Sequence, residues 1–155
     1  MAEYLANAVQ LIALNQPAIF TASIRCNRGC VYHEDETGIF ILRGRTSSCF
    51  ARYQVTFNGN IAIPDGGTVG PIAIALAIDG EPILTSRAIV TPAATATDPP
   101  TAENFSNVTS TAIITVPKGC CFTMAVENVS TPATAGGVTP AILVQNANLT
   151  VSRIA

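Results

Sequence analysis

The residues best suited to chemistry lie in one short, charged stretch near the N-terminus. Cys26, Cys30 and His33 follow the spacing Cys-x3-Cys-x2-His, and Glu34 comes directly after them. Thiolate, imidazole and carboxylate groups are all ligands that zinc accepts. Zinc ribbons and fingers, however, pair two such knuckles, and this sequence has a single candidate. We therefore interpret residues 25–38 as a solvated connection, with a local disulfide as an alternative, and expect no bound metal.

The same stretch is a poor candidate for catalysis. His33 is the only histidine of the chain, and carboxylates surround it rather than a serine or cysteine motif. The sequence contains no Gly-x-Ser-x-Gly elbow, phosphate-binding loop or paired-acid signature. Asp65 and Asp79 lie in turn sequences, where aspartate is favoured because its side chain bonds the local backbone. We expect neither an enzyme nor a cofactor.

Five cysteines are present, at positions 26, 30, 49, 120 and 121. Cys120 and Cys121 are neighbours, so on a strand they would point to opposite faces, and a bond between them would be strained. An odd number leaves at least one free thiol or a bridge between subunits. For a protein kept in a reducing cytoplasm we expect buried, apolar thiols.

The elements that position these residues are predicted to be strands. From Phe50 to Ile63 apolar and polar side chains alternate, and Tyr53, Val55 and Phe57 share one face. This alternation is typical of a half-buried strand. Asn58-Gly59 within it indicates a bulge or a bend rather than a reversal of the chain.

A second strand is predicted from Ile72 to Ile78, where large aliphatic side chains alternate with alanines. The large side chains would fill a core, and the alanine face would lie flat against something or be thinly exposed. Asp79-Gly80 follows, a dipeptide that accepts the positive φ angles of a type I′ hairpin turn. We interpret residues 50–84 as the sheet centre of a β-sandwich.

Further strands are expected toward both ends of the chain. Residues 8–20 indicate an edge strand or two short strands, because Pro17 removes a ladder donor; a helix over residues 4–14 is the alternative. A hairpin is predicted over residues 110–128, and a long last strand over residues 141–154. The apolar face of that last strand comprises Leu143, Ala147, Leu149 and Val151, and its polar face comprises Asn146, Asn148, Thr150 and Ser152.

The composition predicts subunits that cover one another. Hydrophobic residues make up 48% of the chain and charged residues only 12%, whereas about 25% charged residues is usual in soluble domains. A monomer with a Ser/Thr/Asn surface is the alternative. The net charge of −2, without a basic stripe, gives no sign of a nucleic-acid partner. The longest apolar run, residues 71–78, is far too short to span a membrane.

Two segments poor in large apolar side chains, residues 91–107 and 130–140, are predicted to be long loops. Loops of this length are often functional because they present side chains at the surface. The candidate binding residues on them are Thr95, Asp98, Glu103, Asn104 and Thr134.

Roughly eight strands without a convincing helix indicate an all-β fold, a two-sheet antiparallel sandwich or jelly roll. Over residues 39–154 the order of segments resembles the C1q/tumour-necrosis-factor jelly roll. The resemblance rests on FARYQVTF (50–57), IALAIDGEPI (74–83), ITVPKGCCF (114–122) and LTVSRI (149–154). The sequence departs from the family in having no collagen-like Gly-X-Y repeat, and nothing marks the calcium ligands that some members carry.

The resemblance implies a homotrimer packed along one sheet, in agreement with the low charge content. The candidate residues of the trimer interface are Tyr53, Phe57, Asn146, Asn148, Thr150 and Ser152. Such heads cap collagen-like stalks and also occur on bacterial spores and bacteriophages.

We divide the chain into an N-terminal arm with the first strands, residues 1–24, and a jelly-roll domain, residues 25–155. The first ten residues lack a positive region and include Glu3, so we expect no secretory signal. Our hypothesis is a trimeric bacteriophage virion surface protein, a head decoration or fibre head, made in the host cytoplasm and attached to the particle through residues 1–20. Deleting those residues would then abolish incorporation but leave a trimer. The alternative is a bacterial cell- or spore-surface module that recognises carbohydrate or protein.

Overall fold

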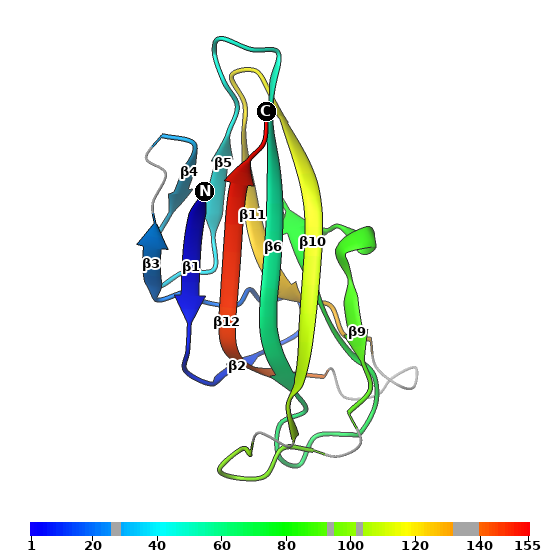
Figure 1. The fold of residues 1–155 in the computed structure, drawn as a ribbon. Coiled ribbons are helices and arrows are strands. Elements are labelled where there is room, and N and C mark those ends of the chain that lie inside the picture. Colours follow the sequence, from blue (N-terminus) through cyan, green and yellow to red (C-terminus); the bar gives the residue numbers. More distant parts are fainter. Residues whose placement is uncertain (26–28, 93–94, 102–103, 132–139) are drawn as a thin grey trace.

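The computed structural model describes residues 1–25, 29–92, 95–101, 104–131 and 140–155, and its strands form two stacked antiparallel sheets (Figure 1). The first sheet consists of β1 (Ala2–Ala6), β2 (Gln10–Ile12), β3 (Ala22–Arg25), β6 (Phe50–Ala62), β10 (Ser106–Pro117) and β12 (Ile142–Arg153). The second sheet consists of β4 (Val31–His33), β5 (Phe40–Arg43), β7 (Ile72–Ile78), β8 (Glu81–Pro82), β9 (Ala88–Val90) and β11 (Cys121–Asn128). The short 3-10 turn η1 (Leu84–Ser86) lies wholly within the described ranges, and no helix there is long and apolar enough to cross a bilayer. The predicted all-β sandwich is confirmed.

β6 is an interior strand of the first sheet, which has the order β10-β6-β12-β1-β3, with β2 beside β12. Its alternation is confirmed, because Tyr53, Val55 and Phe57 are wholly buried while the residues between them face outward. The irregularity expected at Asn58-Gly59 lies on the neighbouring strand instead. β6 pairs with β10 without interruption, but β12 has a register shift opposite this point.

That register shift corrects the predicted faces of the last strand. Asn146 has a positive φ of 52°, and the pairing with β6 shifts between Gln145 and Asn148. The extra residue reverses the alternation. Before the bulge the inward residues are Ile142 and Val144, and after it they are Ala147, Leu149 and Val151. Leu143 therefore faces outward, contrary to the prediction, and pairs with Leu11 of β2.

The second sheet has the order β4-β5-β11-β7-β8, with β9 beside β7. β7 is covered on both faces: its large side chains join the core, and Ala73, Ala75 and Ala77 are at most 1% exposed. The turn after it is confirmed, since Asp79 and Gly80 have φ angles of 51° and 81°.

Two expected neighbour relations are wrong. β6 and β7 lie in different sheets, and the arms of the predicted hairpin 110–128 do not pair with each other. β10 pairs with β6, whereas β11 pairs with β5 and β7. The turn at residues 117–120 carries the chain from one sheet to the other. Side-chain alternation shows which face of a strand is buried but not which strand lies beside it.

The N-terminal residues are part of the sandwich, and the first strands predicted within residues 1–24 are present there as β1 and β2. β1 pairs with β12 and β3, and β2 pairs with β12, so the alternative helix is excluded. Pro17 forms a bridge with Glu127 beside β11, as expected of a proline at a strand edge. The buried side chains of this segment are Ala2, Tyr4, Ala6, Ile12, Ala18 and Phe20.

An aromatic cluster joins the two sheets where their edges part. Tyr4 from β1 and Phe20 meet Phe40 from β5 edge-on, with ring centroids 4.8 and 5.4 Å apart. His33 from β4 stacks on Phe40 at 4.4 Å, with an interplanar angle of 19°. These rings fix β4 and β5 against the first sheet and hold the imidazole in place.

Candidate functional site

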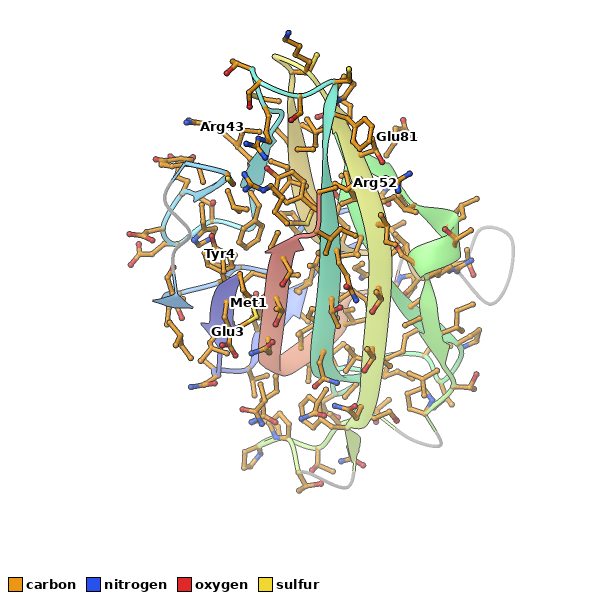
Figure 2. The ribbon with its side chains drawn as sticks, turned by 45° about the horizontal axis from the view of Figure 1, so that its top comes forward. Met1, Glu3, Tyr4, Arg43, Arg52 and Glu81 are labelled. Atoms are coloured by element: carbon orange, nitrogen blue, oxygen red, sulfur yellow. The ribbon has the colours of Figure 1, made fainter. Side chains whose placement is uncertain are left out.

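The outward surface of the first sheet is the most extensive candidate site. Its polar side chains come from three neighbouring strands, and we call the set the neutral face. The neutral face comprises Gln54, Thr56, Asn58, Asn60, Asn107, Thr109, Thr111, Asn148, Thr150 and Ser152. Among the charged side chains of this sheet, Glu3 on β1 adjoins the face next to Asn148 and Thr150, and Arg52 stands near one end of β6 (Figure 2). The face therefore offers amides and hydroxyls, which cost less to remove from water than charges do.

Side chains of the neutral face bond to one another across the strands. Asn58 Nδ2 donates to Thr109 Oγ1 at 2.8 Å, and Asn107 Nδ2 donates to Asn60 Oδ1 at 3.0 Å. At the border, Asn148 Nδ2 donates to Glu3 Oε1 at 2.8 Å. These bonds restrict the rotamers, so a partner that covers the face orders few additional side chains.

The predicted interface residues divide into two groups. Asn146, Asn148, Thr150 and Ser152 face outward, and all but Asn146 belong to the neutral face; their part in an interface stays a prediction. Tyr53 and Phe57 are wholly buried within the chain, so the structure removes them from the candidate interface. They face the core because inward and outward residues alternate along β6, and Tyr53 Oη donates to the carbonyls of Arg43 and Cys30.

An apolar edge adjoins the neutral face on the side of β10. Ile113 on β10, Ile89 on β9 and Leu84 in η1 are 63%, 57% and 77% exposed. β9 and η1 both lie against β10. Exposed large aliphatic side chains on neighbouring elements are typical of contact sites.

The predicted loop residues are partly outside the described part of the chain. Glu103 and Thr134 lie outside the described residues. Asp98 is exposed, whereas Thr95 and Asn104 are half-buried. Asn104 Nδ2 donates to Thr101 Oγ1 at 3.1 Å, so this amide group stabilises the loop locally.

The Cys-x3-Cys-x2-His stretch, for which we expect no bound metal, lies partly outside the described residues. Cys26 lies outside the described residues, and in the described ranges no group of three or more His, Cys, Asp or Glu could hold a metal ion. Cys30 Sγ accepts a hydrogen bond from Arg153 Nη1 at 2.9 Å. His33 Nε2 lies 3.1 Å from the Thr37 carbonyl.

The expectation of buried thiols is wrong for three cysteines. Cys49, Cys120 and Cys121 are exposed, and Cys30 is half-buried; all four are free. The exposed three stand where strands begin or turns end, outside the layer in which the two sheets face each other. Sequence alternation misses this because it applies only along a continuous strand.

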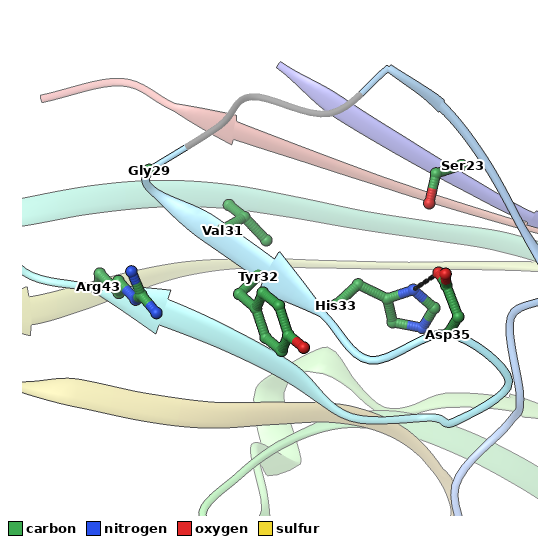
Figure 3. A pocket seen from close by; sticks show the side chains of 7 residues that line it. All are labelled: Ser23, Gly29, Val31, Tyr32, His33, Asp35 and Arg43. Atoms are coloured by element: carbon green, nitrogen blue, oxygen red, sulfur yellow. Dashed lines mark ion pairs between the residues drawn. The ribbon is translucent and has the colours of Figure 1, made fainter.

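A pocket of about 420 Å³ opens beside β4, and sequence reasoning did not identify it (Figure 3). Its lining residues are Ser23, Gly29, Val31, Tyr32, His33, Asp35 and Arg43. Arg43 belongs to the next strand and Ser23 to the other sheet, so only the topology brings them together. Of these residues, sequence reasoning had considered only His33, as a candidate metal ligand.

Glu127 is a buried carboxyl on β11, only 8% exposed. Burial raises the pKa of Glu127, and the Glu81 carboxylate raises it further. A carboxyl with a raised pKa in the folded state favours folding below its unfolded-state pKa, and that contribution is lost as pH rises through the folded-state pKa.

We therefore expect Glu127→Gln to be more stable than the wild-type protein near neutral pH. The difference should shrink toward about pH 3, which lies below the unfolded-state pKa of about 4.3, so that the carboxyl is mostly protonated in both states. Urea titrations at the two pH values measure this, with the exposed Glu81→Gln as the matched variant of smaller effect. A less stable Glu127→Gln near neutral pH contradicts the assignment.

Comparisons with known proteins identify the fold. No protein-family model and no curated protein sequence matches the chain. The globular domain of zebrafish complement 1qA protein aligns over 99% of this chain and 96% of its own, with a TM-score of 0.62 and 14% identity. The EclA C-terminal domain, a sugar-binding protein, aligns over 95% of this chain and 79% of its own, with a TM-score of 0.41 and 14% identity. The second score is too low to add to the argument. The chain therefore has a C1q-like jelly-roll fold.

Proposed function

We propose that this protein is a structural module that assembles as a homotrimer through the neutral face. The observation that carries the proposal is the lack of charge over this face, together with its mutually bonded amides and hydroxyls. An isolated soluble subunit usually presents interspersed charges to water. Burial of such a face costs little desolvation free energy, and the face offers hydrogen-bond donors and acceptors to a second copy.

The neutral face and the apolar edge support a ring. They are different patches, so a contact of one copy's edge with the next copy's face is heterologous. A heterologous contact with suitable rotation closes into a ring, and a trimer is the ring implied by the C1q-family resemblance. Ile113 lies on the outward surface at the border of the two patches.

We further propose that the trimer stands on the surface of a bacteriophage particle, as a head decoration or fibre head. The family resemblance and the sparse charge of the chain support it. A bacterial cell or spore surface is the alternative location. Mass spectrometry of purified phage particles and of stripped cell envelopes from the same culture tests the placement, since the protein should copurify with the particles. Its recovery in the envelope fraction alone contradicts the phage assignment.

A charge placed in the middle of the neutral face should break the assembly. Thr56 lies on β6 between Thr111 of β10 and Thr150 of β12, half-buried among uncharged side chains. We expect Thr56→Arg to run as a folded monomer in size-exclusion chromatography with light scattering, because a buried unpaired guanidinium costs several kcal/mol.

The matched control is Thr46→Arg, which adds the same charge to an exposed residue of the loop between β5 and β6. It should retain the wild-type mass. Equal masses for the two variants and the wild-type protein rule out the neutral face as the interface.

A further inference from the structure

The pocket beside β4 lies where the edge strands of the two sheets part, and the assembly proposed above does not use it. Ser23 on β3 and the strand Val31–His33 form its sides, and its volume of about 420 Å³ falls within the ~300–1,000 Å³ typical of small-molecule sites. The aromatic cluster of Tyr4, His33 and Phe40 lies directly behind it. Because this packed cluster supports the pocket wall, the pocket is largely formed before a ligand binds.

One end of the pocket consists of hydrogen-bond acceptors. His33 has a side chain only 2% exposed, and its Nε2 can donate to the Thr37 carbonyl, which leaves Nδ1 as the acceptor of the neutral ring. Nδ1 is buried without a hydrogen-bond partner and lies 3.8 Å from Asp35 Oδ1. The Asp35 side chain is 93% exposed and can turn aside without loss of packing. This end favours a ligand that brings hydroxyl donors, which would supply the bond that the imidazole lacks.

The other parts of the pocket supply a cation and an aromatic ring. Figure 3 shows Arg43 on one side of Tyr32, with His33 and Asp35 on the other side. The Arg43 guanidinium is exposed and has no carboxylate within salt-bridge distance in the described part of the chain. Tyr32 is 52% exposed. A guanidinium is suited to bind a carboxylate through two parallel hydrogen bonds, and an exposed ring offers an apolar surface at low entropic cost.

We propose that this pocket binds an acidic sugar, a hexuronic acid unit at the end of or within a glycan. Its hydroxyls donate to Asp35 and His33, its C–H face lies on Tyr32, and its carboxylate binds Arg43. A phosphate group uses the guanidinium alone and brings no hydroxyl donors for His33 and Asp35. A neutral sugar leaves Arg43 without a partner. The combination of donors, an apolar ring face and one carboxylate matches all three parts of the pocket.

Titration calorimetry with trigalacturonic acid and the matched neutral galactotriose tests the proposal. The wild-type protein should bind the acidic trisaccharide at least about tenfold more tightly than the neutral one, because a charge-assisted hydrogen bond is worth a factor of this size. Arg43→Gln should remove this preference, while Arg45→Gln, which changes an arginine outside the pocket, should keep it.

Tyr32→Ala should weaken binding of both trisaccharides, and Phe50→Ala, an exposed ring elsewhere, should weaken neither. Circular dichroism of each variant verifies that it is folded. Absence of heat with the acidic trisaccharide at millimolar concentration, equal affinity for the two trisaccharides, or an Arg43→Gln variant that behaves like Arg45→Gln overturns the proposal.

Discussion

Removal of residues 1–20 is expected to leave no folded protein. The segment contributes β1 and β2, and β1 occupies an interior place in the first sheet between β12 and β3. It also contributes Tyr4 and Phe20, both wholly buried in the aromatic cluster. Loss of a buried aromatic side chain costs about 3–5 kcal/mol, and the stability of a whole domain is about 5–15 kcal/mol. The deletion therefore removes more stabilising free energy than the folded domain has in reserve.

Far-ultraviolet circular dichroism and size-exclusion chromatography of the truncated chain measure this outcome. A chain lacking only Met1, which is 54% exposed, serves as the control and should behave like the wild-type protein. A synthetic peptide of residues 1–20 added to the truncated chain should restore strand structure. A truncated chain that remains folded and assembled without the peptide refutes the assignment of these residues to the sandwich.

Phe57→Ala is expected to destabilise the individual subunit rather than its assembly. The ring is wholly buried and lies over Gly59 of the same strand, where an added Cβ would come within 2.7 Å of Phe57 Cζ. Its removal opens a cavity in the core, so the free energy of unfolding should fall by about 3–5 kcal/mol. Urea unfolding at several protein concentrations measures this loss.

The control for that measurement is Thr56→Ala, the adjacent residue on the outward face, which should change the unfolding free energy of the monomer by less than about 0.5 kcal/mol. A core role predicts that the loss in Phe57→Ala is the same at every protein concentration. A loss seen only where the assembled form dominates would instead indicate an interface role, since stability gained by association depends on concentration.

The sequence predicted the fold where local patterns decide it. The alternation along β6, the paired alanines and aliphatic side chains of β7 and the Asp79-Gly80 turn were all correct, because each depends on residues two or three positions apart. Tyr53 and Phe57 were correctly placed on one face of a strand. The error lay in the choice of which face meets a partner subunit and which meets the core.

The alternation of side chains could not predict which strands pair or in which register. The bulge at Asn146 reverses every side chain before it, and neither its presence nor its place is encoded in the alternation. The edge position of Pro17 was predicted, but nothing in the pattern indicated that it would lie beside β11 of the other sheet.

The pocket depends entirely on tertiary structure. Tyr32 and His33 are adjacent in sequence, but Ser23 arrives from the other sheet and Arg43 from the neighbouring strand. Their residue types gave no signal, since an isolated tyrosine, serine or arginine is common on any surface. The aromatic side chains that hold His33 were equally unmarked, because Tyr4, Phe20 and Phe40 come from three separate segments.

Sedimentation equilibrium of the unmodified protein tests most directly whether copies of the chain shield one another's uncharged strands. At micromolar concentration and moderate salt we predict a single species with three times the mass of the 16.1 kDa chain. A species with the mass of one chain, unchanged as the concentration is raised, contradicts the account.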